Sequence, residues 1–229
     1  MGWRIRLINI IIITFNKRAN SFKIVSPFFF NKIMANHVYT TINITGNKEV
    51  MDKLEEIKIK VEENNNDNHI ALINGFYDNM ENTYAWYGEN VGAKWCYHDE
   101  FWVDIEGEYA EIMTTSAWYP PLELVQHIYK ICSPLDVECE IDGDYENEAT
   151  TPIGGFVVNK NGFVHEEYEG EVEYPDEDNY QTEDGELDDE KYDYAMEEYY
   201  ERVNNLRGEM KSLAHSNLNI LLKPETTTN

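Results

Sequence analysis

The sequence predicts an α+β protein, and two observations support this class. Segments that alternate apolar and polar side chains are interleaved with two segments whose apolar residues recur every three or four positions. Their order along the chain is strand, helix, strand, hairpin, helix, strand, which favours an antiparallel sheet with helices on one face. A sheet of this kind belongs to the ferredoxin-like type. An acidic C-terminal extension that ends in a helix is predicted to follow it.

The first predicted strand covers residues 38–44, where apolar residues occupy the even positions. Asn47 follows and is predicted to cap a helix over 48–63. The buried stripe of that helix is expected to consist of Val50, Leu54, Ile57 and Val61. The short apolar run at 70–77 predicts a second strand.

Residues 94–118 predict a β-hairpin that turns at Gly107. Trp95, Tyr97, Phe101, Val103 and Ile105 are expected on its apolar face. Pro120 and Pro121 can open a helix, because a first-turn residue has no helical partner for its N–H group. The stripe of this second helix is expected to comprise Leu124, Val125, Ile128, Ile131 and Cys132.

Two further strand signals follow. Alternation from Leu135 to Ile141 predicts a strand, and residues 154–158 and 163–168 predict a final hairpin. At the C-terminal end, the regular apolar spacing from Tyr192 to Leu213 predicts a long amphipathic helix.

The chain is expected to consist of five segments. Residues 1–33 contain six Lys and Arg and no Asp or Glu, and are either a targeting segment or upstream sequence preceding a true start at Met34. Residues 34–168 form the predicted domain. An acidic linker at 169–186 precedes the helix predicted over 187–214, and residues 215–229 form a tail.

The composition excludes several classes of function. A formal net charge of −26 argues against direct binding of nucleic acid, which relies on Lys and Arg to neutralise phosphates. The most apolar stretch near the N-terminus, residues 8–13, is too short to span a bilayer. Three cysteines are too few for a disulfide framework, so a reducing compartment, the cytoplasm, is expected. For a viral protein this compartment is the cytoplasm of the host cell.

No metal, cofactor or catalytic residue is expected from the sequence motifs. Cys96, Cys132 and Cys139 are fewer than the four thiolates of an iron–sulfur cluster. Cys96 and His98 provide only two of the four ligands of a structural zinc site. Residues 142–146 resemble a calcium loop, but the required glycine and bidentate acid are missing, so an acidic strand end is the better interpretation.

A dense set of aromatic residues is the main candidate for a binding surface. Trp102 is predicted to project among acids on the face opposite the core, whereas Trp95 and Trp118 fit core packing as well as binding. Tyr199 and Leu206 are expected at the centre of the contact that the C-terminal helix makes. The full candidate set is Trp86, Lys94, Trp95, Trp102, Trp118, Tyr119, Tyr199 and Leu206.

Three segments in order resemble motifs of a known family. They are Tyr87–Trp95, Thr115–Pro121, and Tyr145–Glu148 leading to Gly154-Gly155-Phe156. Together they are similar to the YubB-like ferredoxin-like domain family, uncharacterised proteins carried mostly by phages and plasmids. Val91 and Cys96 depart from the family pattern. The resemblance covers residues 34–165 and implies a fold and a mobile-element origin, but no activity.

These observations favour an intracellular accessory protein of a phage or mobile element that binds another protein. Its acidic, aromatic-rich surface is expected to contact a basic surface of the partner. A sharper alternative is a nucleic-acid mimic that inhibits a DNA-handling enzyme. The other alternative is an enzyme whose site no motif reveals. The sequence does not indicate an oligomeric state.

Overall fold

The computed structural model describes residues 13–16, 21–24, 36–63, 68–148, 152–168, 170–182 and 185–221. Contacts divide the chain into two units, residues 1–35 and residues 36–229. In the first unit, strands β1 (Ile13–Asn16) and β2 (Ser21–Ile24) pair in antiparallel fashion, which the sequence pattern did not predict. The expected start at Met34 lies outside the described residues.

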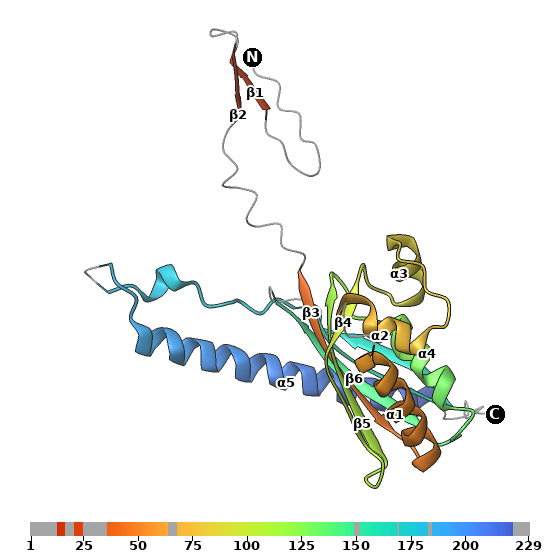
Figure 1. Ribbon diagram of the computed structural model, residues 1–229. Coiled ribbons are helices and arrows are strands. Elements are labelled where there is room, and N and C mark those ends of the chain that lie inside the picture. Colours follow the sequence, from red (N-terminus) through yellow and green to blue (C-terminus); the bar gives the residue numbers. More distant parts are fainter. Residues whose placement is uncertain are drawn as a thin grey trace, which may run out of the picture. The chain divides into compact units, whose positions relative to one another are not determined.

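The second unit has the predicted α+β class (Figure 1). Its six-stranded antiparallel sheet has the order β4-β5-β3-β6-β7-β8. The sheet consists of β3 (His37–Thr45), β4 (Cys96–Asp104), β5 (Tyr109–Ala117), β6 (Glu140–Asn147), β7 (Ile153–Asn159) and β8 (Gly162–Glu167). The described helices are α1 (Lys48–Glu63), α2 (Asn68–Phe76), α3 (Tyr84–Asn90), α4 (Leu122–Cys132), α5 (Asp189–Leu221) and the short 3₁₀ helix η2 (Glu177–Tyr180).

Helix α1 begins where the sequence predicted. The side chain of Asn47 accepts a hydrogen bond from the backbone N–H of Val50 at 3.1 Å, which satisfies a donor that has no partner within the helix. All four residues of the expected stripe are buried. The prediction of this helix, its cap and its core face is confirmed.

The strand predicted at 70–77 is wrong, because this segment forms α2. Gly75 explains why a helix fits here. A Cβ atom at Gly75 would lie 2.5 Å from a methyl group of Val61, so only glycine lets α2 approach α1 this closely. An apolar run of this length gives no periodicity that distinguishes a strand from a buried helix.

The hairpin of β4 and β5 is present, but the predicted face of its first residues is wrong. A register shift between His98 and Glu100 marks a β-bulge at Asp99. Before the bulge Cys96 is fully buried, and after it Phe101 is buried. The extra residue moves the buried side chains from even to odd positions, so Tyr97 lies on the opposite face, whereas Trp95, just before β4, packs partly against the core.

Strand β6 starts at Glu140, later than the predicted start at Leu135. Leu135 and Val137 are exposed in the turns that precede it. Within the strand, Gly143 lies opposite Phe156 and Tyr145 lies opposite Gly154. In both pairs the aromatic side chain occupies the space beside the glycine. A Cβ atom on Gly143 would lie 2.4 Å from the Phe156 ring, and one on Gly154 would lie 2.3 Å from the Tyr145 hydroxyl oxygen. These pairs explain why the core rings need glycine on the neighbouring strand.

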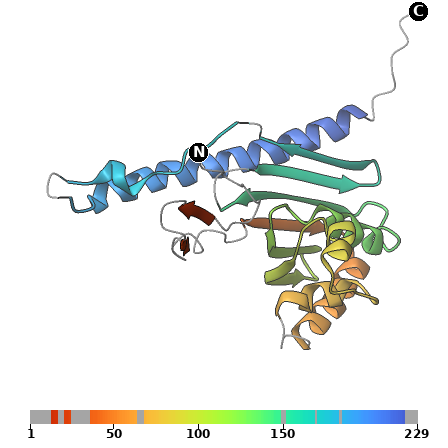
Figure 2. The same ribbon diagram turned by 90° about the horizontal axis from the view of Figure 1, so that it is seen from above.

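Helices α1, α2 and α4 lie on one face of the sheet, as predicted for the domain, and α5 of the C-terminal extension packs on the other face. The main core joins the sheet to α1, α2 and α4. Helix α5 packs on the other face of the β6–β8 half, where Val157 and Val164 contact Ala214 and Leu218. Figure 2 shows α5 lying along the β7–β8 hairpin. At Gly155 a Cβ atom would be only 2.2 Å from the backbone nitrogen of Lys211, so helix and strand are in close contact.

Helix α5 is longer than predicted and includes residues assigned to the tail. The acidic segment before it is also less free than expected. Val172 is buried against Ile153, Tyr199 and Val203, and η2 contacts α5. The Tyr174 ring meets the Tyr199 ring edge to face at 5.1 Å.

Replacing Thr40 with valine is expected to raise the free energy of unfolding by about 1 kcal/mol. The Thr40 side chain is 3% exposed, and its hydroxyl has no hydrogen-bond partner among the described residues. Valine keeps the shape and removes a buried polar group. Urea unfolding of the two proteins checks this, with Thr41→Val on the opposite face as the control. A loss of stability in Thr40→Val would show that the hydroxyl is bonded in solution.

Candidate functional site

The sheet has one face that α5 covers only in part. We call the outer surface of β3, β4 and β5 the open face. It is formed by Tyr39, Thr41, Asn43, Tyr97, Trp102, Glu111, Met113 and Thr115. Their side chains share this face because alternate residues of a strand point the same way and the register aligns the three strands. Helix α5 contacts β6, β7 and β8, next to this surface.

Large apolar side chains on the open face are accessible to solvent. Trp102 is 45% exposed, Tyr39 is 42% exposed and Met113 is 39% exposed. The Trp102 ring lies 5.8 Å from the Tyr109 ring, which fixes it at the end of the hairpin. Tryptophan, tyrosine and methionine are the residue types enriched in protein interfaces. The prediction that Trp102 projects on the face opposite the core agrees with this geometry.

A second group of rings lies at the start of β3. Trp95 and Tyr97 stack with 5.4 Å between ring centroids, and His37 lies 5.5 Å from Trp95. The His37 ring also stacks on Tyr39 at 6.5 Å, and its Nδ1 is 2.7 Å from a carboxylate oxygen of Glu148. Trp95 is partly buried, and it contacts both this group of rings and the edge of the main core.

The open face is strongly acidic. Strands β3, β4 and β5 contain Asp99, Glu100, Asp104 and Glu111 but no Lys or Arg. Burial raises the pKa of Tyr39, and the carboxylates of Glu148 and Asp99 raise it further. Burial also raises the pKa of Tyr109 to about 12, with Glu111 contributing. Both phenols stay neutral at physiological pH and present a hydroxyl group beside negative charge.

Trp118 and Tyr119 form an exposed turn directly after β5. Trp118 is 42% exposed, which is inconsistent with the core packing that the sequence allowed. Its backbone φ of 75° is in the left-handed region, which a bulky residue rarely adopts and which costs about 1–3 kcal/mol. The Trp118 N–H donates to the carbonyl of Asn36 at 2.9 Å, so the turn lies at the same end of the sheet as His37.

The remaining aromatic candidates lie elsewhere. Trp86 is half-buried and meets the Tyr77 ring edge to face at 5.0 Å, as part of the packing of α3. Lys94 is exposed, and its Nζ lies 4.8 Å from the centroid of the Tyr84 ring. Tyr199 and Leu206 pack on the protein's own sheet and acidic segment. The structure thus places Trp102 on the open face near the β4–β5 turn, and Trp95 and Trp118 at the end of the sheet where β3 begins, followed by Tyr119.

A ladder of opposite charges joins α5 to β6. Four acids face the helix from alternate positions of the strand, namely Glu140, Asp142, Asp144 and Glu146. Arg207 pairs with Asp144 at 2.5 Å, and Lys211 pairs with Asp142 at 3.2 Å. One helical turn further, His215 Nε2 is 3.1 Å from Asp142. Burial raises the pKa of Glu146, and Arg207 opposes this shift.

Among the described residues, one group has the donor atoms to hold a metal ion: Glu140, Asp142 and His215. The sequence did not reveal it, because His215 lies 73 positions after Asp142 in the chain. The cysteines are buried, and burial raises the pKa of Cys96 to about 12. Its neighbour His98 has a lowered pKa for the same reason.

Sequence reasoning also missed Tyr39, Tyr97 and Met113. Tyr39 and Met113 occupy positions treated as the solvent side of their strands, and Tyr97 was assigned to the core face because the bulge could not be seen. The available signal was a large aromatic or apolar side chain at a position that the alternation of the strand assigns to solvent.

Comparison of the chain with protein-family models, curated proteins and solved structures found no match. No described helix is both long enough and apolar enough to cross a bilayer.

Proposed function

We propose that this chain is an accessory protein of a phage or mobile element that binds a protein partner through the open face. The observation that carries the proposal is the exposure of Trp102, Tyr39 and Met113 on strands that contain four acids and no basic residue. Such a surface fits a partner with a basic rim around an apolar centre. Its acidity disfavours direct binding of nucleic acid.

The fold assignment belongs to the same proposal. Strands β4, β5, β3 and β6 are neighbours in that order, and α1 and α4 connect them in the pattern βαββαβ. This arrangement supports a ferredoxin-like domain extended by β7 and β8. It is compatible with the resemblance to the YubB-like family and hence with an intracellular protein of mobile-element origin.

Nucleic-acid mimicry is the second candidate, and it involves a different surface. The first half of α5 exposes carboxylates on successive turns, at Glu190, Asp193, Glu197 and Glu201. Repeated negative charges at helical spacing can occupy a groove that binds phosphates. This candidate predicts that binding depends on α5 carboxylates and not on the aromatic residues of the open face.

A comparison of two double variants in affinity capture tests the proposal. The first variant, Tyr39→Ala with Trp102→Ala, removes two exposed rings of the open face. The control, Ile59→Ala with Tyr194→Ala, removes two side chains that are 47% and 61% exposed on α1 and α5. Loss of central aromatic anchors costs about 2 kcal/mol or more each, so capture of the partner should fall at least tenfold.

The wild type and the control are expected to capture the same basic protein, with binding weakened by high salt. Capture of the same protein by the open-face variant would contradict the proposal. Loss of capture on neutralising Glu197 and Glu201, with the open-face variant unaffected, would favour mimicry. Failure of the wild-type protein to capture any partner would contradict both.

A further inference from the structure

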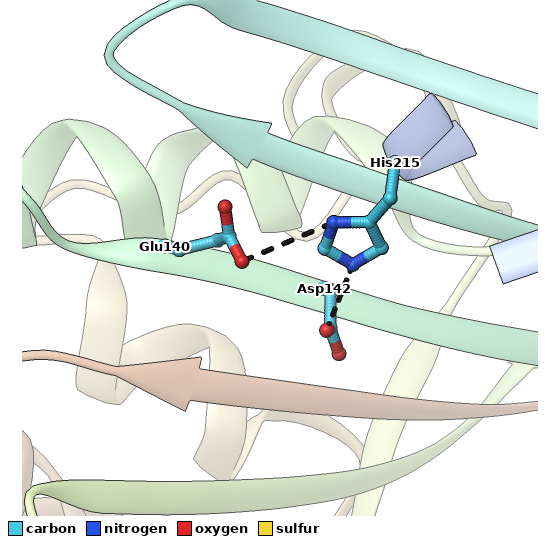
Figure 3. A group of neighbouring side chains, drawn as sticks. All are labelled: Glu140, Asp142 and His215. Atoms are coloured by element: carbon cyan, nitrogen blue, oxygen red, sulfur yellow. Dashed lines mark hydrogen bonds and ion pairs between the residues drawn. The ribbon is translucent and has the colours of Figure 1, made fainter. Parts of the chain in front are cut away.

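The group formed by Glu140, Asp142 and His215 is built from two elements that meet only in the folded protein (Figure 3). The two carboxylates are alternate residues of β6 and point to the same side. His215 comes from α5, one turn after Lys211. One donor atom from each residue lies within 4.8 Å of the others.

In each carboxylate, one oxygen accepts hydrogen bonds from neighbouring side chains, and the other oxygen is directed at His215. Asp142 Oδ1 accepts hydrogen bonds from Asn43 Nδ2 at 3.0 Å and Lys211 Nζ at 3.2 Å, while Oδ2 faces His215 Nε2. Glu140 Oε2 accepts a hydrogen bond from Asn159 Nδ2 at 2.7 Å, and Oε1 lies 4.0 Å from His215 Nδ1. Such outer contacts orient the ligands of metal sites.

Along β6, the carboxylates that face α5 outnumber the Lys and Arg side chains that pair with them. Four carboxylates of β6 face α5, and Arg207 and Lys211 neutralise two of them at neutral pH. A divalent cation bound between Glu140 and Asp142 would add positive charge where carboxylates are in excess.

We propose that Glu140, Asp142 and His215 bind a divalent transition-metal ion of the zinc type. An imidazole nitrogen favours zinc and its neighbours in the periodic table over magnesium and calcium, which prefer oxygen ligands alone. Three protein ligands and a water molecule complete four-coordination. Metal–ligand bonds of ~2.1 Å place the ligand atoms of a tetrahedral site ~3.4 Å apart. The three side chains must therefore move about 1 Å closer together on binding. The imidazole must also turn one of its nitrogens toward the ion.

The bound ion would connect the C-terminal half of α5 to β6. It lies on the half of the sheet that α5 covers, and the inference does not depend on the proposed function. Binding to the folded state alone also stabilises the protein by mass action.

Titration of the full chain with zinc chloride by isothermal calorimetry tests the site. The wild type is expected to bind one zinc ion per chain. The His215→Gln variant is expected to bind zinc at least tenfold more weakly. His37→Gln is the matched control, because His37 also contacts a carboxylate but has no second one beside it in the described structure. Replacing zinc with Co²⁺ should give the visible absorption of a tetrahedral site, and magnesium at millimolar concentration should not compete.

Glu140→Gln keeps the size of the side chain and provides a second variant if His215→Gln unfolds. Circular dichroism establishes that each variant is folded. Equal zinc affinity in the wild type and His215→Gln, or no binding by the wild type at about 100 μM zinc, would overturn the inference.

Discussion

Gly155→Ala is expected to lower the free energy of unfolding by about 3 kcal/mol, at the upper end of the usual cost of overpacking. The added Cβ atom would lie 2.2 Å from the backbone nitrogen of Lys211 and 2.5 Å from its Cα. A helix backbone cannot rotate away as a side chain can, so α5 must move off β7. Such movement would also separate Arg207 and Lys211 from their partners on β6. Urea unfolding measures the change.

Gly208→Ala is the matched control, because it makes the same substitution in α5 at a position outside this contact. Gly208 lies within α5, and nothing lies within 4 Å of the Cβ atom that it lacks. Alanine in a helix interior is expected to add up to about 1 kcal/mol of stability. Similar effects at the two glycines would contradict the close packing of α5 on the sheet.

The double variant Tyr199→Asp with Leu206→Asp is expected to lower stability by about 3–5 kcal/mol, since each buried side chain of this size contributes about 1.5–3 kcal/mol. Both residues pack in a cluster with Ile153, Val172 and Val203. Because these contacts are within one chain, the melting temperature should fall equally at low and high protein concentration.

The control for this prediction is Tyr200→Asp with Leu213→Asp. It changes the same residue types on the same helix, but these side chains are 52% and 41% exposed. Its melting temperature should stay close to that of the wild type. A dependence on protein concentration in the Tyr199 and Leu206 variant would instead show that the apolar stripe of α5 serves an interface between chains.

The parts of the fold with one buried face could be predicted from the sequence. Helix α1, the β4–β5 hairpin and α4 each bury one side and expose the other, and this difference produces a readable period. Helix α2 could not be recognised, because its short run contains Ala71, Leu72 and Ile73 in succession, all of them buried. Its helical state depends on close packing against α1.

The candidate surfaces could be predicted only in part. Trp102 was identified because Glu100 and Asp104, the residues two positions away on either side, are acidic and therefore mark the solvent face of the strand. Tyr97 was placed on the wrong face, because a bulge at Asp99 depends on the pairing of β4 with β5 and leaves no local signal. The group at His215 required knowing that α5 lies across β6. Long-range pairing of this kind is not encoded in the spacing of neighbouring residues.

A photo-crosslinking amino acid at position 102 tests the role of the open face most directly. The same amino acid at position 59 is the control, because Ile59 is as exposed as Trp102 but lies on α1, on the other side of the sheet. In cells that naturally produce this protein, illumination is expected to give one crosslinked species from position 102 and none from position 59. Mass spectrometry should identify the partner as a protein with a basic surface. No crosslink from position 102, or the same species from both positions, would contradict binding through the open face.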